Sequence, residues 1–184
     1  RPVKSVIFAP FGVLRQTVPP RHGMRRGLQK VVVSLSLAIC EPEAEHGGRV
    51  FDHGGIERML SGGVALQNFA VWAPLDVTDA LACSMSEVTE VLRLLREAPT
   101  QVHLCTRPEH LALPGIGIVL SIESGESINC SVERIEQFYG WGVRMASLTW
   151  NLENDFASGC LSEGEIKPLG RDALRVMNRL DIAL

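Results

Sequence analysis

The residue best placed to do chemistry is Glu123, because it follows an apolar segment directly. Residues 116–122 form a short run rich in β-branched side chains, which predicts a strand buried on both faces. A second predicted strand, residues 143–148, ends shortly before Trp150 and Asn151. If the two strands are parallel, all three side chains lie near one edge of the sheet, where active sites of parallel α/β proteins gather. Glu123 is then either a functional carboxylate or an ordinary acid of a solvated loop or helix start.

The segment between these two strands predicts a helix. Ser131 can cap its start, and Glu133 places negative charge in its first turn. Apolar residues recur at helical spacing, and Gly140 and Gly142 stop the helix. A strand–helix–strand unit of this length joins two parallel neighbours with a right-handed crossover.

Other elements follow from pattern and turn signals along the chain. The expected strands are residues 3–9, 63–74, 102–105 and 181–184; residues 27–39 suit a strand or a buried helix equally. A short helix is expected at residues 56–61, and Ser84 and Glu87 read as a capping box for a helix reaching Ala98. Pro168 opens a last helix, on which Arg171, Arg175 and Arg179 indicate a solvated face or, alternatively, a site for an anionic partner.

Three segments carry a resemblance to a known family. The sequences VLSIESGESI, FYGWGVRMASLTWNLEN and PLGRDALRVMNRL resemble the renal or membrane dipeptidases, which are zinc peptidases built on a TIM-like barrel. The resemblance implies an α/β fold with mostly parallel strands. At 184 residues the chain would hold about half of a full barrel, as a single domain over residues 1–184, because a complete barrel needs about 250 residues.

The resemblance also assigns roles to positions in this sequence. It makes Glu123 the only surviving metal ligand, bridging two zinc ions, and places Trp150, Asn151 and Asn154 in a substrate pocket. Two further ligand positions of the family, a His and an Asp, align with Pro10 and Gly12. Neither residue has a side-chain donor atom, so we expect no cofactor in the isolated chain, and zinc only if a partner completes the site.

The resulting expectation is a truncated, degenerate dipeptidase-like pseudoenzyme that acts structurally or as a regulator through association. The expected partner is a second copy or a chain carrying the C-terminal half of the barrel, since an unfinished parallel sheet leaves an apolar edge. The alternative is one part of a zinc-dependent dipeptidase or amidohydrolase, with the remaining ligands on another chain or a missing C-terminal half. A small-molecule binding module using the pocket near Trp150 is a third reading.

Composition excludes several other classes of protein. Apolar residues make up 46% and charged residues 21%, with a net charge of −3, which is typical of an ordinary globular protein. Acids and bases alternate without a basic patch, so no nucleic-acid partner is expected. The longest apolar run, residues 31–40, is half a membrane span, so no membrane segment is expected. Five widely spaced cysteines without a C-x-x-C pair predict reduced thiols and a cytoplasmic location.

Overall fold

The computed structural model describes residues 31–37, 53–74 and 76–184. The predicted strand at residues 3–9, Pro10 and Gly12 lie outside the described residues. Within them, no helix is both long enough and apolar enough to cross a membrane.

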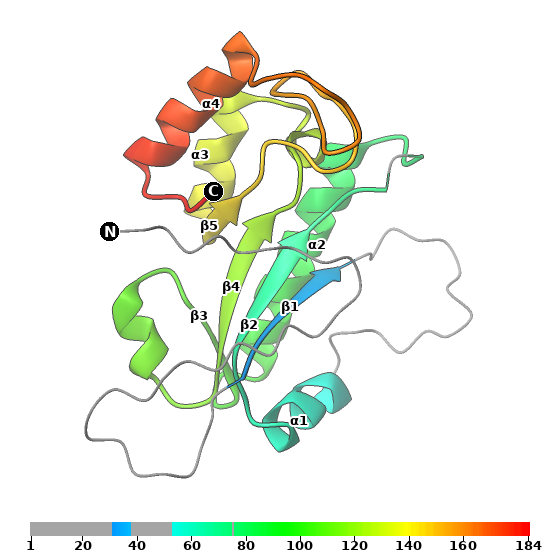
Figure 1. The fold of residues 1–184 in the computed structure, drawn as a ribbon. Coiled ribbons are helices and arrows are strands. Elements are labelled where there is room, and N and C mark those ends of the chain that lie inside the picture. Colours follow the sequence, from blue (N-terminus) through cyan, green and yellow to red (C-terminus); the bar gives the residue numbers. More distant parts are fainter. Residues whose placement is uncertain (1–30, 38–52, 75) are drawn as a thin grey trace.

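A parallel sheet forms the centre of the molecule (Figure 1). Its strands are β1 (Val31–Leu37), β2 (Val64–Val71), β3 (Val102–Leu104), β4 (Ile116–Ile122) and β5 (Val143–Ala146). Every pairing between them is parallel, in the order β1-β2-β4-β3, with β5 also on β4. The sheet is open rather than closed, so the predicted α/β class and partial barrel are confirmed. The ambiguous residues 27–39 contain a strand, not a helix.

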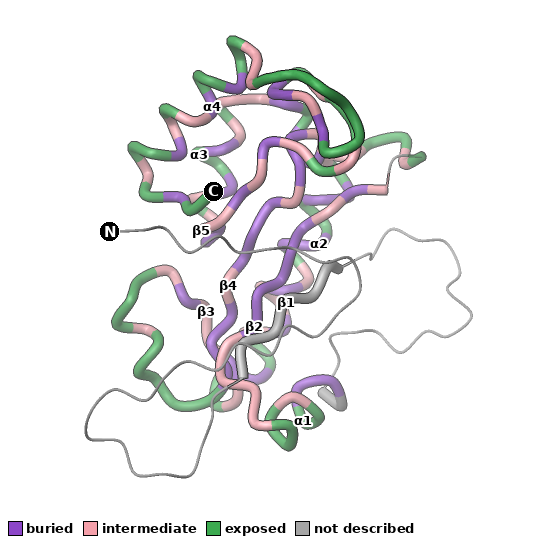
Figure 2. The backbone as a smooth tube through the Cα atoms, viewed as in Figure 1, coloured by how far each residue is buried: buried purple, intermediate pink, exposed green. Residues whose placement is uncertain are grey.

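The strand that precedes Glu123 lies in the middle of this sheet. One edge of β4 pairs with β2 along residues 117–122; its other edge pairs with β3 along residues 116–118 and with β5 along residues 120–122. Six of the seven residues of β4 are buried (Figure 2), and Ile116, Ile118 and Leu120 are fully inaccessible. The continuous apolar run therefore reflects burial on both faces, as predicted.

Helices cover the sheet and connect its strands. They are α1 (His53–Ser61), α2 (Ala80–Glu97), α3 (Val132–Gly140) and α4 (Pro168–Arg179), with short 3-10 helices η1 (Pro108–Ala112) and η2 (Gly125–Ile128). α3 begins at the predicted cap, where the Ser131 hydroxyl accepts a hydrogen bond from the Arg134 amide. α3 and α4 lie side by side above β5 (Figure 1) and are joined by an ion pair between Arg179 and Glu136.

The predicted capping box is wrong. α2 begins four residues before Ser84, where the carboxylate of Asp79 accepts a hydrogen bond from the amide of Ala82. Ser84 and Glu87 therefore lie inside the helix, and both side chains are completely buried. The S-x-x-E spacing also places two residues one turn apart on a single helix face, so the pattern alone does not distinguish the two placements.

Of the strand predicted at residues 181–184, the structure shows one isolated bridge. Ala183 pairs with Met145 of β5 in a parallel bridge; the Ala183 amide donates to Arg144, and its carbonyl accepts from the Ala146 amide. On α4, the three arginines each form an ion pair, with Glu165, Asp172 and Glu136 respectively. This favours the solvated-face reading of the arginine stripe over an anion site.

The expectation that all cysteines are reduced is wrong for Cys83, which is disulfide-bonded. Cys105, Cys130 and Cys160 are free, and Cys40 lies outside the described residues. Disulfides are rare in reducing compartments, so the thiol argument for a cytoplasmic location loses support and the location stays a prediction.

The three free thiols are expected to differ in reactivity toward a disulfide reagent. Burial raises the pKa of the Cys105 and Cys130 thiols, which keeps them protonated and shielded, whereas Cys160 is exposed. Of these three thiols, that of Cys160 should react within minutes in the native protein, and those of Cys105 and Cys130 only after denaturant is added. Peptide mapping after a short pulse checks this; early labelling of Cys130 would contradict the packing described here.

Candidate functional site

Glu123 lies at the carboxyl edge of the sheet, where the sequence places it. Its amide donates to the Val71 carbonyl at the end of β2 over 2.9 Å, and its carbonyl accepts from the Ser127 hydroxyl over 3.0 Å. The next residue is tied to the end of β5, because the Ser124 amide donates to the Ser147 hydroxyl. The ends of three strands thus converge at this half-buried glutamate.

The chain turns sharply after Glu123. Ser124 adopts φ 76° and ψ 144°. In a residue other than glycine, this backbone conformation carries a strain energy of about 1–3 kcal/mol. Asn129 and Cys130 also have positive φ, so the short η2 turn is flanked by unusual backbone at both ends. This geometry brings a second carboxylate, that of Glu126, back over the sheet edge, where it accepts hydrogen bonds from the Ser124 hydroxyl and the Asn154 amide group.

Asn154 holds this arrangement together. Its amide nitrogen donates to Glu126 over 2.8 Å and to the Leu148 carbonyl over 2.7 Å. Its amide oxygen accepts from the backbone amides of Phe156 and Ala157. The side chain therefore fixes the loop after β5 against the η2 turn. Its assignment to a substrate pocket stays a prediction, as does that of Trp150 and Asn151.

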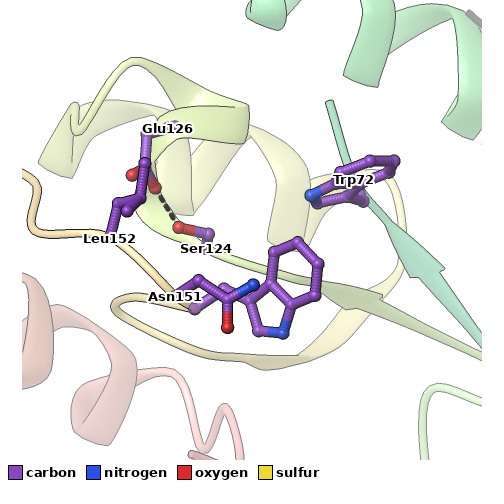
Figure 3. A pocket seen from close by; sticks show the side chains of 6 residues that line it. Trp72, Ser124, Glu126, Asn151 and Leu152 are labelled. Carbon is purple, nitrogen blue, oxygen red and sulfur yellow. Dashed lines mark hydrogen bonds between the residues drawn. The ribbon is translucent and has the colours of Figure 1, made fainter. Parts of the chain in front are cut away.

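A shallow open depression with about 20 Å³ of room, enough for about one water molecule, lies at this edge (Figure 3). Its lining residues are Trp72, Ser124, Glu126, Trp150, Asn151 and Leu152. Two of them, Trp150 and Asn151, belong to the predicted pocket. Sequence reasoning missed Trp72, which follows β2 as Trp150 follows β5, and Glu126, for which the E-S-G-E spacing was the available signal.

The two indoles pack against each other although they are far apart in the sequence. The ring centroids of Trp72 and Trp150 are 5.7 Å apart, and the ring planes meet at 81°. Trp72 is held by its backbone amide, which donates to the buried carboxylate of Glu87 over 2.9 Å. The depression thus has one aromatic wall of two perpendicular rings and a carboxylate fixed by Ser124 and Asn154.

The described part of the chain does not by itself fit a catalytic metal. Among residues 31–37, 53–74 and 76–184, no group of three His, Cys, Asp or Glu side chains comes together. A catalytic zinc ion is normally held by three protein ligands, whereas Glu123 would supply one. We therefore derive no step that passes through a metal.

The strained Ser124 gives a direct stability prediction. Replacing it with Gly or with Ala removes the same hydroxyl, but only Gly adopts φ 76° without strain. Ser124→Gly should therefore exceed Ser124→Ala in free energy of unfolding by about 1–2 kcal/mol, measured by urea titration. Equal stabilities would show that this backbone conformation is absent in solution.

Comparison with known proteins gives one consistent family. The family model of membrane dipeptidases (peptidase family M19) matches residues 29–184. An uncharacterized dipeptidase of Schizosaccharomyces pombe is 38% identical over 69 residues, which cover 35% of this chain and 17% of that protein.

Solved structures show the same fold. A metallopeptidase named dipeptidase AC superposes with a TM-score of 0.65 at 21% identity, over 73% of this chain and 48% of its own. A metallopeptidase of Rhodobacter sphaeroides, solved with a phosphinate mimic of the dipeptide L-Ala-D-Ala, gives 0.61 at 20% identity, over 70% and 48%. The chain therefore spans less than half the length of these relatives.

Proposed function

Since the chain belongs to the membrane dipeptidase family, we propose that it is a degenerate half-barrel which acts through association and does not itself hydrolyse dipeptides. Its role is structural or regulatory. The observation that supports this proposal is the open sheet, in which Ala183 forms a bridge with Met145 of β5.

The edge at the end of the described chain has the properties of an unfinished sheet. Ala183 uses both backbone groups toward β5, and Ile182 is buried, whereas the Leu184 side chain is 72% exposed. In the part of the chain that the structure describes, no strand pairs with the far side of residues 182–184. Unpaired apolar strands recruit further strands. We infer that this edge receives them, whether from a second copy or from a chain with the C-terminal half.

The ligand positions support the absence of hydrolysis. Pro10 and Gly12 stand where the resemblance requires a His and an Asp, and neither can bind a metal through its side chain. Glu123 is left as one carboxylate donor, which holds zinc too weakly to polarise a peptide carbonyl.

Light scattering at micromolar concentration tests the association. We expect a dimer or larger species that dissociates on Leu184→Lys, because a charged side chain on the edge opposes strand pairing. Leu113→Lys is the matched control, since this leucine is also exposed (48%) but lies after η1 on another strand connection. A monodisperse monomer, or equal dissociation by both variants, would contradict the proposal.

The position of Glu123 favours one second candidate, a metal-dependent dipeptidase assembled from two parts. Its backbone is fixed between β2 and η2 at the carboxyl end of β4, as a ligand position requires. If this candidate is correct, adding a chain with the remaining barrel strands should give stoichiometric zinc and dipeptide turnover that Glu123→Gln abolishes. Association without zinc favours the structural role.

A further inference from the structure

We infer that His110 caps the outer edge of β3 and thereby keeps this edge from pairing with a strand of a second copy of the chain. In the part of the chain that the structure describes, β4 is the only strand that pairs with β3, so β3 is an edge strand. Uncovered edge strands recruit strands of other molecules, and a covering loop prevents this. The cap acts on β3 and is therefore independent of the proposed association beside β5.

The backbone of β3 and the two residues after it alternates between β4 and the outer edge. The Gln101 carbonyl and the Cys105 amide each bond to the backbone of β4, over 2.8 Å and 2.6 Å. Successive residues of a strand direct their N–H and C=O groups to opposite sides, so Leu104 and Thr106, on either side of Cys105, face away from β4. These outward groups are the ones that a further strand would bind.

The imidazole of His110 lies over these outward groups. Its Nδ1 atom is 2.9 Å from the Leu104 carbonyl oxygen and 3.3 Å from the Thr106 amide nitrogen, so one ring covers both. η1 folds back to bring the ring there, and the His110 carbonyl oxygen lies 2.9 Å from the Nε2 atom of His103 on β3. The Thr106 carbonyl accepts from the Arg144 side chain over 3.0 Å. An incoming strand therefore meets backbone groups that are already occupied or covered.

Arg107 determines which nitrogen of the His110 ring carries the proton. Its Nε and Nη2 atoms lie 3.4 Å and 3.3 Å from the Nε2 atom of His110, and a guanidinium group can only donate. Nε2 is therefore the acceptor, which leaves the proton of the neutral ring on Nδ1, where it points at the Leu104 carbonyl. Since Nδ1 cannot donate and accept at once, the Thr106 amide is covered by the ring without a hydrogen bond to it.

Nitrogen NMR of the histidine rings tests this arrangement in the unaltered protein, because it distinguishes a protonated from an unprotonated ring nitrogen. We expect the proton of His110 on Nδ1. Arg107→Ala should move part of the population to the Nε2–H tautomer, because the donor that faces Nε2 is lost. Arg175→Ala removes an exposed arginine of α4 and should leave the tautomer unchanged. A His110 ring protonated on Nε2 in the unaltered protein would overturn the inference.

Removal of the cap tests its effect on assembly. His110→Ala should raise the average mass measured by light scattering about twofold over that of the unaltered protein at the same concentration, because a second copy can now pair at β3. Leu111→Ala removes the next side chain of η1, which is 53% exposed, and should leave the mass unchanged. The same increase is expected when His110→Ala is combined with Leu184→Lys, so the outcome does not depend on the edge beside β5.

A second substitution separates an opened edge from general unfolding. Thr106→Pro removes an outward N–H group that the cap covers, and proline opposes strand pairing at an edge. Combined with His110→Ala, it should restore the mass of the unaltered protein. An unchanged mass for His110→Ala, or a large species that persists in the double variant, would overturn the inference.

Discussion

Gly170→Ala is expected to lower the free energy of unfolding by about 3 kcal/mol, the upper end for overpacking. Gly170 is buried in the first turn of α4, and a Cβ atom there would lie 2.0 Å from the Phe156 carbonyl oxygen. That oxygen already accepts the Lys167 amide, so it is fixed in the connection between the loop and α4. Since the obstacle is backbone, either the helix or the loop must move.

A matched control exists in the neighbouring helix. Gly140 ends α3, and a Cβ atom there meets nothing within 4 Å, so Gly140→Ala should be neutral or slightly stabilising. Urea titration of both variants measures the difference. The fully buried Phe156 also lies against Gly125 of the η2 turn, so a shift of this loop should reach that turn as well. Equal stability of the two variants would contradict the close packing of α4 against the Phe156 carbonyl.

Glu87→Ala should cost a similar amount, about 3 kcal/mol. This glutamate is completely buried in α2, and its carboxylate accepts the backbone amide of Trp72 over 2.9 Å. Truncation leaves a cavity and removes the hydrogen-bond acceptor of the partly buried Trp72 amide. Because the Glu87 carboxylate holds the backbone of Trp72, the NMR signal of the Trp72 indole N–H should also change.

Two further variants show whether the stability depends on the hydrogen-bond acceptor of Glu87 or on the volume of its side chain. Glu87→Gln keeps an oxygen of similar position and should lose less than half as much stability as Glu87→Ala. Glu97→Ala removes a glutamate of the same helix that is exposed and pairs with Arg93, and exposed ion pairs contribute little. Thermal and urea unfolding measure all three. A Glu87→Ala protein as stable as Glu97→Ala would show that the buried contact carries no stability.

The sequence correctly predicts those strands and helices whose signal lies within a few neighbouring residues. The apolar run of β4, the Ser131 cap of α3 and the proline at the start of α4 each have one local cause, and each element forms where predicted. The start of α2 was missed because Asp79 and Ser84 both have side chains that can cap, and only tertiary packing decides which one is buried.

The site was predicted in part for a similar reason. Parallel strands place Glu123, Trp150 and Asn151 at one edge, and that follows from topology alone. The approach of Glu126 depends on the positive φ of Ser124, and that of Trp72 on a hydrogen bond to a residue 15 positions away. Neither is visible in hydrophobic periodicity, so the second carboxylate and the packed pair of indoles required the three-dimensional structure.

The central proposal is that this half-barrel associates and does not itself hydrolyse dipeptides. The most direct test combines zinc analysis of the purified, metal-loaded chain with turnover of a dipeptide panel. We predict less than one zinc ion per chain and no turnover that depends on Glu123. Stoichiometric zinc, together with dipeptide cleavage that Glu123→Gln abolishes in the chain alone, would contradict the claim.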